Sequence, residues 1–577
     1  MIGVIVDPAE HDVVREFFEL FKTPWEFSRG DSQYDVLLCT GEVPDDTTAK
    51  LIIVYAGRRA QFDNYPTSAT TAQSKDGCFL SYQGTQIPIY GNFTTFQSEG
   101  TALLSEESSR ECAAYLLESD KRVLARIGYD LFGEIRTLLT VGQPPVNASI
   151  PTLEMHIAIL RDLIVSCGFP LAEIPPIPDG YRFVVCLTHD VDHPSIRLHK
   201  FDHTTIGFLF RALFVSVIDT LLGRMPVRDV IRNWIAAFKL PFVHLGLARD
   251  FWRDFDDRYL ELEKDLPSTF FVIPRKNYSG KRDNGPAPAS RASRYEANDI
   301  ADAIRKLRSA GCEVGLHGID AWLATSTGHD EFEEVRRLSG ASEIGVRMHW
   351  LYYNEKSPAA LEQAKAAYDS TSGYNETVGF RAGTTQVYKP LEAKQLLELP
   401  LHAMDTSLFY LSYLGLSPRR AAFRLKQMAD CVAKFGGCLT VNWHDRSLAP
   451  ERLWVGCYRD LIQELRSQGA WFATAGQAVS WFRKRRSVTF ETDFAKSPAV
   501  GVKLSVNREE NLPPLRLRIY QPAERGTNCP TTFVDLAVEK GLATLDSSKL
   551  GLSIPSDQKP NELGCEINRQ RQSELAR

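Results

Sequence analysis

Between residues 180 and 484 one pattern recurs: a short apolar run, a polar tip and then a stretch with helical periodicity. Alternating strands and helices over this length predict an α/β fold, a parallel (β/α) barrel, whose polar tips gather at the carboxyl ends of the strands. Helices are expected at 299–310 and 419–435. The candidate strands are residues 183–188, 268–273, 313–316, 345–350, 378–381, 401–405 and 438–443.

Residues 1–140 are predicted to form a separate N-terminal α/β domain of unreadable role. Apolar runs indicate strands at 2–7, 35–40 and 51–55, and an apolar stripe indicates a helix at 11–21. Residues 120–139 are also expected to be helical, and residues 141–179 to form a linker with a helix. Neither a G-x-G-x-x-G nor a Walker sequence is present, so nucleotide binding has no support.

Two further regions flank or interrupt the barrel. Residues 194–264, after the first barrel strand, are predicted to be a mostly helical insertion. Residues 487–556 alternate like short strands between Pro-containing turns, which indicates a small, β-sandwich-like accessory domain. From residue 557 to 577 the chain is polar without periodicity, and we expect a disordered tail.

Composition excludes some partners and suggests a compartment. A hydrophobic fraction of 44%, a charged fraction of 24% and a net charge of −5 are typical of a folded soluble protein and give no electrostatic case for nucleic acid. The eleven cysteines contain no C-x-x-C pair, and the first residues lack a signal-peptide pattern, so cytoplasmic residence is predicted. The apolar run 206–222 contains Arg211 and Asp219, which favours a buried or surface-lying helix, with membrane-surface association as the lesser alternative. The oligomeric state is not readable.

The first barrel strand ends in Thr188-His-Asp-Val-Asp-His193, which places Asp190 and Asp192 two residues apart. Alternate side chains of a strand face the same way, so the two carboxylates point together and repel each other unless a cation lies nearby. A divalent metal, with one carboxylate as its ligand and the other as a neighbouring base, is one interpretation. The alternative is an ordinary strand end that runs into a polar turn.

The other predicted strands also end in polar residues. The joint placement of histidines, aspartates and arginines at one rim favours an enzyme over separate structural roles. These tips are His317, Arg347, His349, Arg381, Asp405, Asn442 and His444.

The motifs at these tips resemble the polysaccharide deacetylase family with the NodB-homology fold. They are Thr188-His-Asp-Val-Asp192, Ser268-Thr-Phe-Phe271, Glu313-Val-Gly-Leu-His-Gly318, Val346-Arg-Met-His349, Gly379-Phe-Arg381 and Trp443-His444, in the order the family has them. The resemblance covers roughly residues 180–484. It implies a distorted (β/α) barrel and metal-dependent hydrolysis of an acyl group, usually the N-acetyl group of a sugar.

By position, the resemblance implies a role for each tip. Asp190 resembles the catalytic base, Asp192 the metal-binding aspartate and His317 the first metal histidine. Arg381 matches the arginine that orients the base, and His444 the histidine that acts as the acid. Asp405 lies where the family often has a carboxylate that supports this histidine.

Two positions depart from the commonest family pattern. Val191 separates the two aspartates, as in a D-x-D branch of the family, and Ala321 stands where the second metal histidine is usual. We therefore expect His349 to supply the missing nitrogen ligand from the next strand. A divalent ion, most plausibly Zn²⁺, is then held by Asp192, His317 and His349.

The predicted function is deacetylation of an acetylated sugar or polysaccharide precursor, a biosynthetic intermediate that fits a cytoplasmic enzyme. Two alternatives remain open: a carbon–nitrogen hydrolase acting on a non-sugar amide or cyclic ureide, and a degenerate barrel that binds glycan without catalysis. Four aromatic residues are candidates either for stacking on a sugar ring or for packing the core: Trp322, Trp350, Tyr352 and Trp443.

Overall fold

The computed structural model describes residues 1–543, and the predicted tail 557–577 lies outside the described residues. Gaps within the described range fall at residues 30–31, 45–46, 61–62, 64–68, 73–77, 98–99, 120, 201, 224, 450–451, 453, 492–500, 505–510, 523–531 and 539–541.

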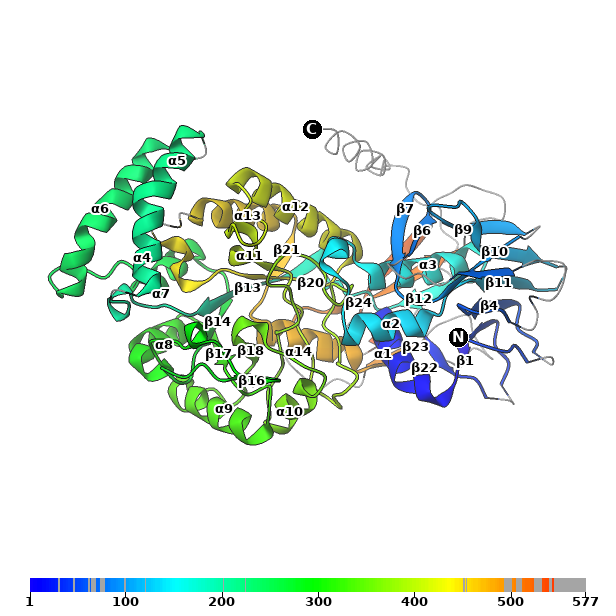
Figure 1. Ribbon diagram of the computed structural model, residues 1–577. Helices are drawn as coiled ribbons and strands as arrows, with labels where there is room; N and C mark the ends of the chain where they lie inside the picture. Colours follow the sequence, from blue (N-terminus) through cyan, green and yellow to red (C-terminus); the bar gives the residue numbers. More distant parts are fainter. Residues whose placement is uncertain are drawn as a thin grey trace.

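The N-terminal part is built on one mixed sheet covered by helices (Figure 1). A parallel half runs β2 (Trp25–Phe27), β1 (Ile2–Ile5), β3 (Val36–Cys39), β4 (Leu51–Tyr55) and β11 (Val123–Ile127). An antiparallel half continues with β10 (Cys112–Glu118), β9 (Thr101–Glu106), β6 (Cys78–Tyr82) and β7 (Thr85–Ile89), with β8 (Phe93–Phe96) and β5 (Ala69–Ala72) beside β10. Three helices share its core: α1 (His11–Phe21), α2 (Leu131–Thr140) and α3 (Thr152–Ser166).

The helix expected over residues 120–139 is wrong in its first half. Residues Val123–Ile127 form strand β11, which lies parallel to β4 and antiparallel to β10, and only Leu131–Thr140 is helical. A short apolar run fits a buried strand and a helix equally well by periodicity. The two neighbouring strands, which satisfy both sets of backbone hydrogen bonds, decide between them.

The central part is a curled parallel sheet ringed by helices, as the alternation of strands and helices predicts (Figure 1). The sheet curls into an incomplete barrel. Single parallel bridges from Val346 to Asp369 and from Asp369 to Glu398 extend it beyond the edge strand that contains Val346. The strand order is β18 (Val346–Met348), β17 (Glu313–Gly318), β14 (Ser268–Val272), β13 (Phe183–Val191), β20 (Cys438–Asn442) and β19 (Ala403–Met404), with β21 (Ala470–Phe472) also beside β13. The helices are α8 (Ala301–Ser309), α9 (Thr325–Ser339), α10 (Ser357–Gln363), α11 (Asp405–Phe409), α12 (Pro418–Phe435), α13 (Val455–Ser467) and α14 (Ala475–Arg486).

The strand expected at residues 378–381 is not formed. The N–H of Gly379 donates to the carbonyl of His402, and the N–H of Phe380 donates to the carbonyl of Ala148. Gly379 has φ +152°, and a Cβ there would lie 2.0 Å from the oxygen of Ala148. The backbone of this segment therefore packs directly against the backbone at Ala148, which precedes the barrel in sequence, and only glycine fits at position 379.

Two groups of elements lie outside the sheet of the barrel. The insertion contains α4 (His203–Phe210), the π-helical η5 (Arg211–Val215), α5 (Ser216–Leu221), α6 (Val227–His244) and α7 (Phe255–Leu262), and the short hairpin of β15 (Lys281–Arg282) and β16 (Gly285–Pro286) follows β14. The C-terminal strands form two antiparallel sheets: β12 (Leu171–Glu173) with β24 (Leu515–Gln521) and β25 (Thr532–Val538), and β22 (Val488–Glu491) with β23 (Gly501–Leu504) and β26 (Leu542–Ala543). Since β12 precedes the barrel, two of the C-terminal strands, β24 and β25, share a sheet with the segment predicted as a linker.

Candidate active site and metal centre

The polar tips meet at the carboxyl edge of the parallel sheet. Asp190 is the second-last residue of β13 and Asp192 directly follows the strand, while His317 is in β17 and His349 directly follows β18. Because β13, β14, β17 and β18 are successive parallel neighbours, these strand ends fall on one side of the sheet. Asn442 and His444 reach the same edge from β20, which pairs with the other side of β13.

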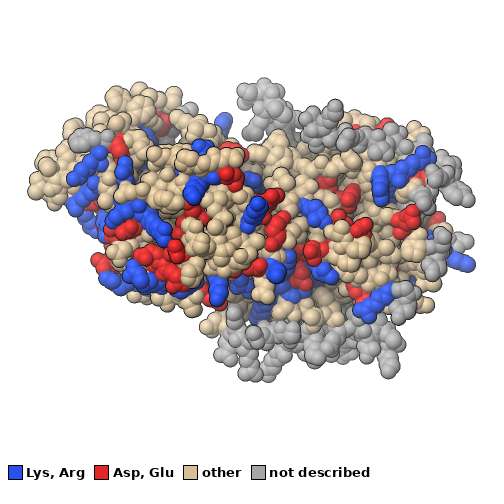
Figure 2. Space-filling view, turned by 60° about the horizontal axis from the view of Figure 1, so that its bottom comes forward, with Lys and Arg blue, Asp and Glu red and all other residues tan. Residues whose placement is uncertain are grey.

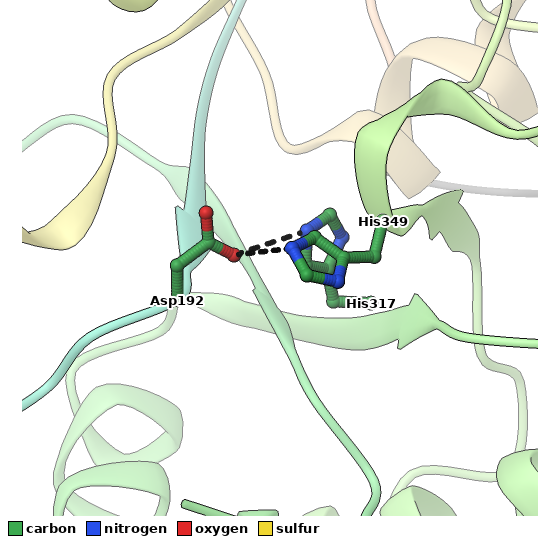
Figure 3. A group of neighbouring side chains, drawn as sticks. All are labelled: Asp192, His317 and His349. Atoms are coloured by element: carbon green, nitrogen blue, oxygen red, sulfur yellow. Dashed lines mark ion pairs between the residues drawn. The ribbon is translucent and has the colours of Figure 1, made fainter. Parts of the chain in front are cut away.

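Asp192, His317 and His349 form a compact group (Figure 3). Oδ1 of Asp192 lies 3.3 Å from Nε2 of His317 and 3.7 Å from Nε2 of His349. One ligand atom from each residue lies within 4.8 Å of the others. Figure 3 shows both imidazole rings directed at the carboxylate, that of His317 from β17 and that of His349 from the turn after β18.

This group fits a zinc-sized cation. Ligands at the usual ~2.0–2.2 Å from tetrahedral zinc are roughly 3.3–3.6 Å apart, close to the observed separations. The buried Oδ1 of Asp192 has no hydrogen-bond partner among the described residues. Coordination to a cation would compensate this oxygen for its burial. Nδ1 of His317 donates to the carbonyl of Arg347 at 2.9 Å, and this bond turns Nε2 toward Asp192 with its lone pair free.

The protonation states also suit metal binding. Burial favours the neutral carboxylic acid of Asp192, but the nearby rings of His349, His317 and His444 hold its pKa well below the usual range. Burial lowers the pKa of His349 well below its ordinary value, against the attraction of Asp192. An ionised carboxylate and a neutral imidazole are the forms that bind a metal.

Asp190 lies beside this group in a different environment. Its Oδ1 accepts a hydrogen bond from Nη1 of Arg347 at 3.1 Å, and its Oδ2 accepts one from Nδ2 of Asn442 at 2.8 Å. The N–H of Asp190 also donates to Oδ1 of Asn442 at 3.0 Å. Oδ2 lies 3.9 Å from Nε2 of His317. The carboxylate is therefore held rigidly next to the candidate metal ligands without belonging to them.

The arginine beside Asp190 is Arg347, and the expectation of Arg381 in this position is wrong. Nη1 of Arg381 donates to the carbonyl of Gly373 at 3.3 Å, and its guanidinium lies over the ring of Tyr374. Arg347 is fully buried over the ring of Phe271 and is fixed further by Thr188 and Ser370. The two-residue spacing of Arg347 and His349 in the sequence already predicts that their side chains share one face of the strand. Asn442 and His444 have the same spacing, and both also reach the site.

His444 closes the site from the opposite side. Its Nδ1 lies 2.6 Å from Oδ1 of Asp405, and its Nε2 lies 3.7 Å from Oδ2 of Asp192. Burial by itself would lower the pKa of His444, but the charges of Asp405, Asp192 and Asp190 raise it to about 10. These carboxylates favour the imidazolium form of His444, and its Nε2 is directed at the site. Asp405 is completely buried and accepts further hydrogen bonds from the N–H of His444 and from the hydroxyl of Ser447.

A cleft of about 1710 Å³ leads to these residues. Among the four aromatic candidates, Trp350 is 40% exposed and lines the cleft with Tyr352, whereas Trp322 and Trp443 are buried in the barrel core. At one edge Tyr410 accepts hydrogen bonds from Arg446 and Arg452. Burial opposes ionisation of Tyr410, but the two guanidinium charges lower its pKa to about 8. This part of the cleft was not predicted, because its residues come from short irregular segments and a 3-10 turn, which carry no periodicity.

No model of a protein family matches the chain, and no curated protein sequence matches it. Among solved structures, one described as a polysaccharide deacetylase from Mycobacterium smegmatis is 18% identical, with 54% of this chain and 94% of that chain covered at a TM-score of 0.33. The carbohydrate deacetylase Agd3 is 10% identical, with 94% and 99% covered at a TM-score of 0.35. Puue allantoinase is 14% identical, with 54% and 92% covered at a TM-score of 0.32.

The first of these descriptions names a polysaccharide deacetylase, the class that the sequence motifs resemble, and the second names a carbohydrate deacetylase. TM-scores of this size add no argument about the site itself. Its chemistry follows from the side chains described above.

Proposed function

We propose that this protein is a metal-dependent deacetylase of the D-x-D type, which hydrolyses the N-acetyl group of an acetylated sugar or polysaccharide precursor inside the cell. The observation that carries the proposal is the placement of Asp190. This carboxylate is held by Arg347 and Asn442 beside the candidate metal group, and the imidazolium of His444 faces the same space.

Each residue then has a chemical task. A divalent cation, Zn²⁺ by ligand type, would be held by Asp192, His317 and His349 and would polarise the acyl carbonyl and acidify a water. Asp190 accepts the proton of the attacking water, and Arg347 and Asn442 keep its carboxylate oriented. His444 donates a proton from Nε2 to the nitrogen as the C–N bond breaks, which leaves acetate and a free amine. Asp405 positions His444 and keeps it protonated.

The experiment compares metal content with turnover. We expect the purified protein to contain about one divalent ion by elemental analysis and to release acetate from N-acetylated oligosaccharides. Asp190→Asn should keep the metal and lose hydrolysis by roughly 10²–10⁴-fold. His317→Ala should lose both, and Asp302→Asn, at an exposed acid on α8, is the matched control.

Three outcomes would contradict the proposal in different ways. Full activity of Asp190→Asn or His317→Ala would remove the assigned chemistry. Hydrolysis of a cyclic ureide or a non-sugar amide in preference to acetylated sugars would keep the site and change the substrate. Metal-free protein that binds glycan without turnover would indicate a degenerate barrel.

A further inference from the structure

The insertion after β13 forms a helical hairpin at one end of the molecule (Figure 1). Its first arm is continuous from α4 through η5 to α5, and α6 returns beside it. The arms pack on each other and on the barrel rim through small and apolar side chains, among them Ala212, Ala237 and Trp252. The hairpin lies at the opposite end from the N-terminal domain.

The hairpin presents large apolar side chains to solvent. Along α6 they fall on one helical face, because their spacing follows the helical period. Soluble monomers rarely expose apolar surface of this extent, which marks a site of interaction. Six of these side chains, between 53% and 82% exposed, are Phe214, Leu221, Ile231, Phe238, Phe242 and Leu245.

The first arm is long and apolar enough to cross a membrane by length and composition alone. His203–Leu221 has a mean hydropathy of 1.5, and 28% of its most apolar window is buried. However, Arg211 and Asp219 on this arm line the catalytic cleft, and another side of the arm packs on α6 and the rim. One apolar face turned outward, with charges on the cleft side, suits a helix that lies on a membrane surface.

A second element carries exposed apolar side chains across the cleft. In the loop after α11, Leu411 is 89% exposed, and Tyr413 and Leu414 are also exposed. Leu411 and Tyr413 line the same cleft as residues of the hairpin, and that cleft reaches His317 and His444. The cleft therefore opens between two apolar edges, the α4–α6 hairpin and the loop of residues 411–414, which we call its two lips.

Both lips have basic residues nearby. Arg228, Arg232 and Lys239 are exposed on α6, whose first-turn acid, Asp229, is paired with Arg232 at 3.3 Å. Beyond the loop, Arg419 and Arg420 are exposed at the start of α12. Figure 2 shows the hairpin end, at the left, as a largely uncharged surface with Lys and Arg along its lower border and some Asp and Glu among them. Cations beside an apolar face complement the phosphates of an anionic bilayer.

We propose that the α4–α6 hairpin and the 411–414 loop dock on an anionic membrane surface and hold the cleft mouth at the level of the lipid headgroups. On the basis of the proposed deacetylase function, the substrate class is then an acetylated sugar anchored to a lipid. The lipid part stays in the bilayer, and the sugar enters the cleft between the two lips.

The docking surface is tested first, without any substrate. The protein is floated with vesicles of phosphatidylglycerol and phosphatidylcholine, and with vesicles of phosphatidylcholine alone. We expect binding to the anionic vesicles that weakens with added salt, and about a tenfold loss of binding in Phe238→Ser/Leu245→Ser. The matched control is Val146→Ser/Phe533→Ser, which removes two exposed apolar side chains elsewhere.

Failure of the unaltered protein to bind anionic vesicles, or an equal loss in the control variant, would overturn the docking surface. Self-association that Phe238→Ser/Leu245→Ser abolishes in the absence of vesicles would assign the surface to a second copy of the chain and would also overturn it.

The substrate class is tested next, with an N-acetylated oligosaccharide either free or attached to a phospholipid in anionic vesicles. We expect the anchored form to be turned over at least tenfold faster at equal concentration. Phe238→Ser/Leu245→Ser should lose this advantage and keep its activity on the free form. Equal turnover of both forms would overturn the inference, whereas hydrolysis of neither form would contradict the deacetylase function and leave the vesicle result to decide docking.

Discussion

Nη1 of Arg347 lies 3.1 Å from Oδ1 of Asp190, and both side chains are almost completely buried. The two residues come from strands separated in the sheet by β14 and β17. The side chain of Arg347 therefore spans the two intervening strands, over the ring of Phe271, to hold the carboxylate. A buried pair of this kind depends on geometry, because an imperfectly placed partner leaves a charge unsatisfied.

Replacement of this arginine should separate charge from geometry. In Arg347→Lys the positive charge remains, but the planar fork that also binds Thr188 and Ser370 is lost. We expect kcat to fall about 100-fold, as is typical of a misplaced catalytic group, with metal content retained. Arg381→Lys is the matched control and should stay close to the parent. Equal effects of the two variants on kcat would show that the role of Arg347 is not specific.

The pair of His444 and Asp405 makes a prediction about pH. Asp405 is the largest of the charges that raise the pKa of His444 to about 10, so the imidazolium persists through neutral pH and is lost as pH rises through about 10. If His444 is the acid, activity falls on the alkaline side. Asp405→Asn should lower the pKa of His444 and move this alkaline limb to lower pH.

The measurement is the pH profile of kcat/KM, which reports groups of the free enzyme. Ser447→Ala, which removes only a hydrogen bond to Asp405, serves as the control and should shift the limb less. An alkaline limb at the same pH in Asp405→Asn would exclude His444 as the group that titrates.

Metal affinity tests the unusual third ligand. Ala321 stands where the family usually has its second metal histidine. If His349 takes over that role, His349→Ala should weaken zinc binding by more than the ~10–100-fold typical of a residue that only orients a ligand. Competition with a chelator gives the affinity directly. His329→Ala, at an exposed histidine on α9, should bind zinc as the parent does. Unchanged affinity in His349→Ala would leave the site with only two protein ligands.

At the start of β18 the ring of Tyr368 lies so close to the backbone of Gly345 that only glycine fits there. A Cβ on Gly345 would lie 2.0 Å from the buried ring of Tyr368. Gly345→Ala should therefore lower the free energy of unfolding by about 1–3 kcal/mol or more, as overpacking does. Gly456→Ala, where a Cβ meets nothing within 4 Å, should be neutral or slightly stabilising within α13. Urea unfolding compares the two, and equal stabilities would contradict the packing argument.

The sequence alone determines the strand–helix alternation of the barrel and most of its polar tips. Parallel strands carry their chemistry at their carboxyl ends, and a two-residue spacing puts side chains on one face. Both rules are local, so they locate Asp190, Asp192, His317, His349 and His444 without knowledge of the packing. They also indicate that Arg347 and His349 share a face.

Only the tertiary structure decides which tips meet. Residues 123–127 become a strand because two neighbouring strands accept them, and residues 378–381 stay irregular because they lie against the carbonyl of Ala148. Arg347 rather than Arg381 reaches Asp190 because β18 curls back toward β13 while Arg381 is held at Gly373. These outcomes depend on contacts between segments far apart in the chain, and a local periodicity carries no information about such contacts.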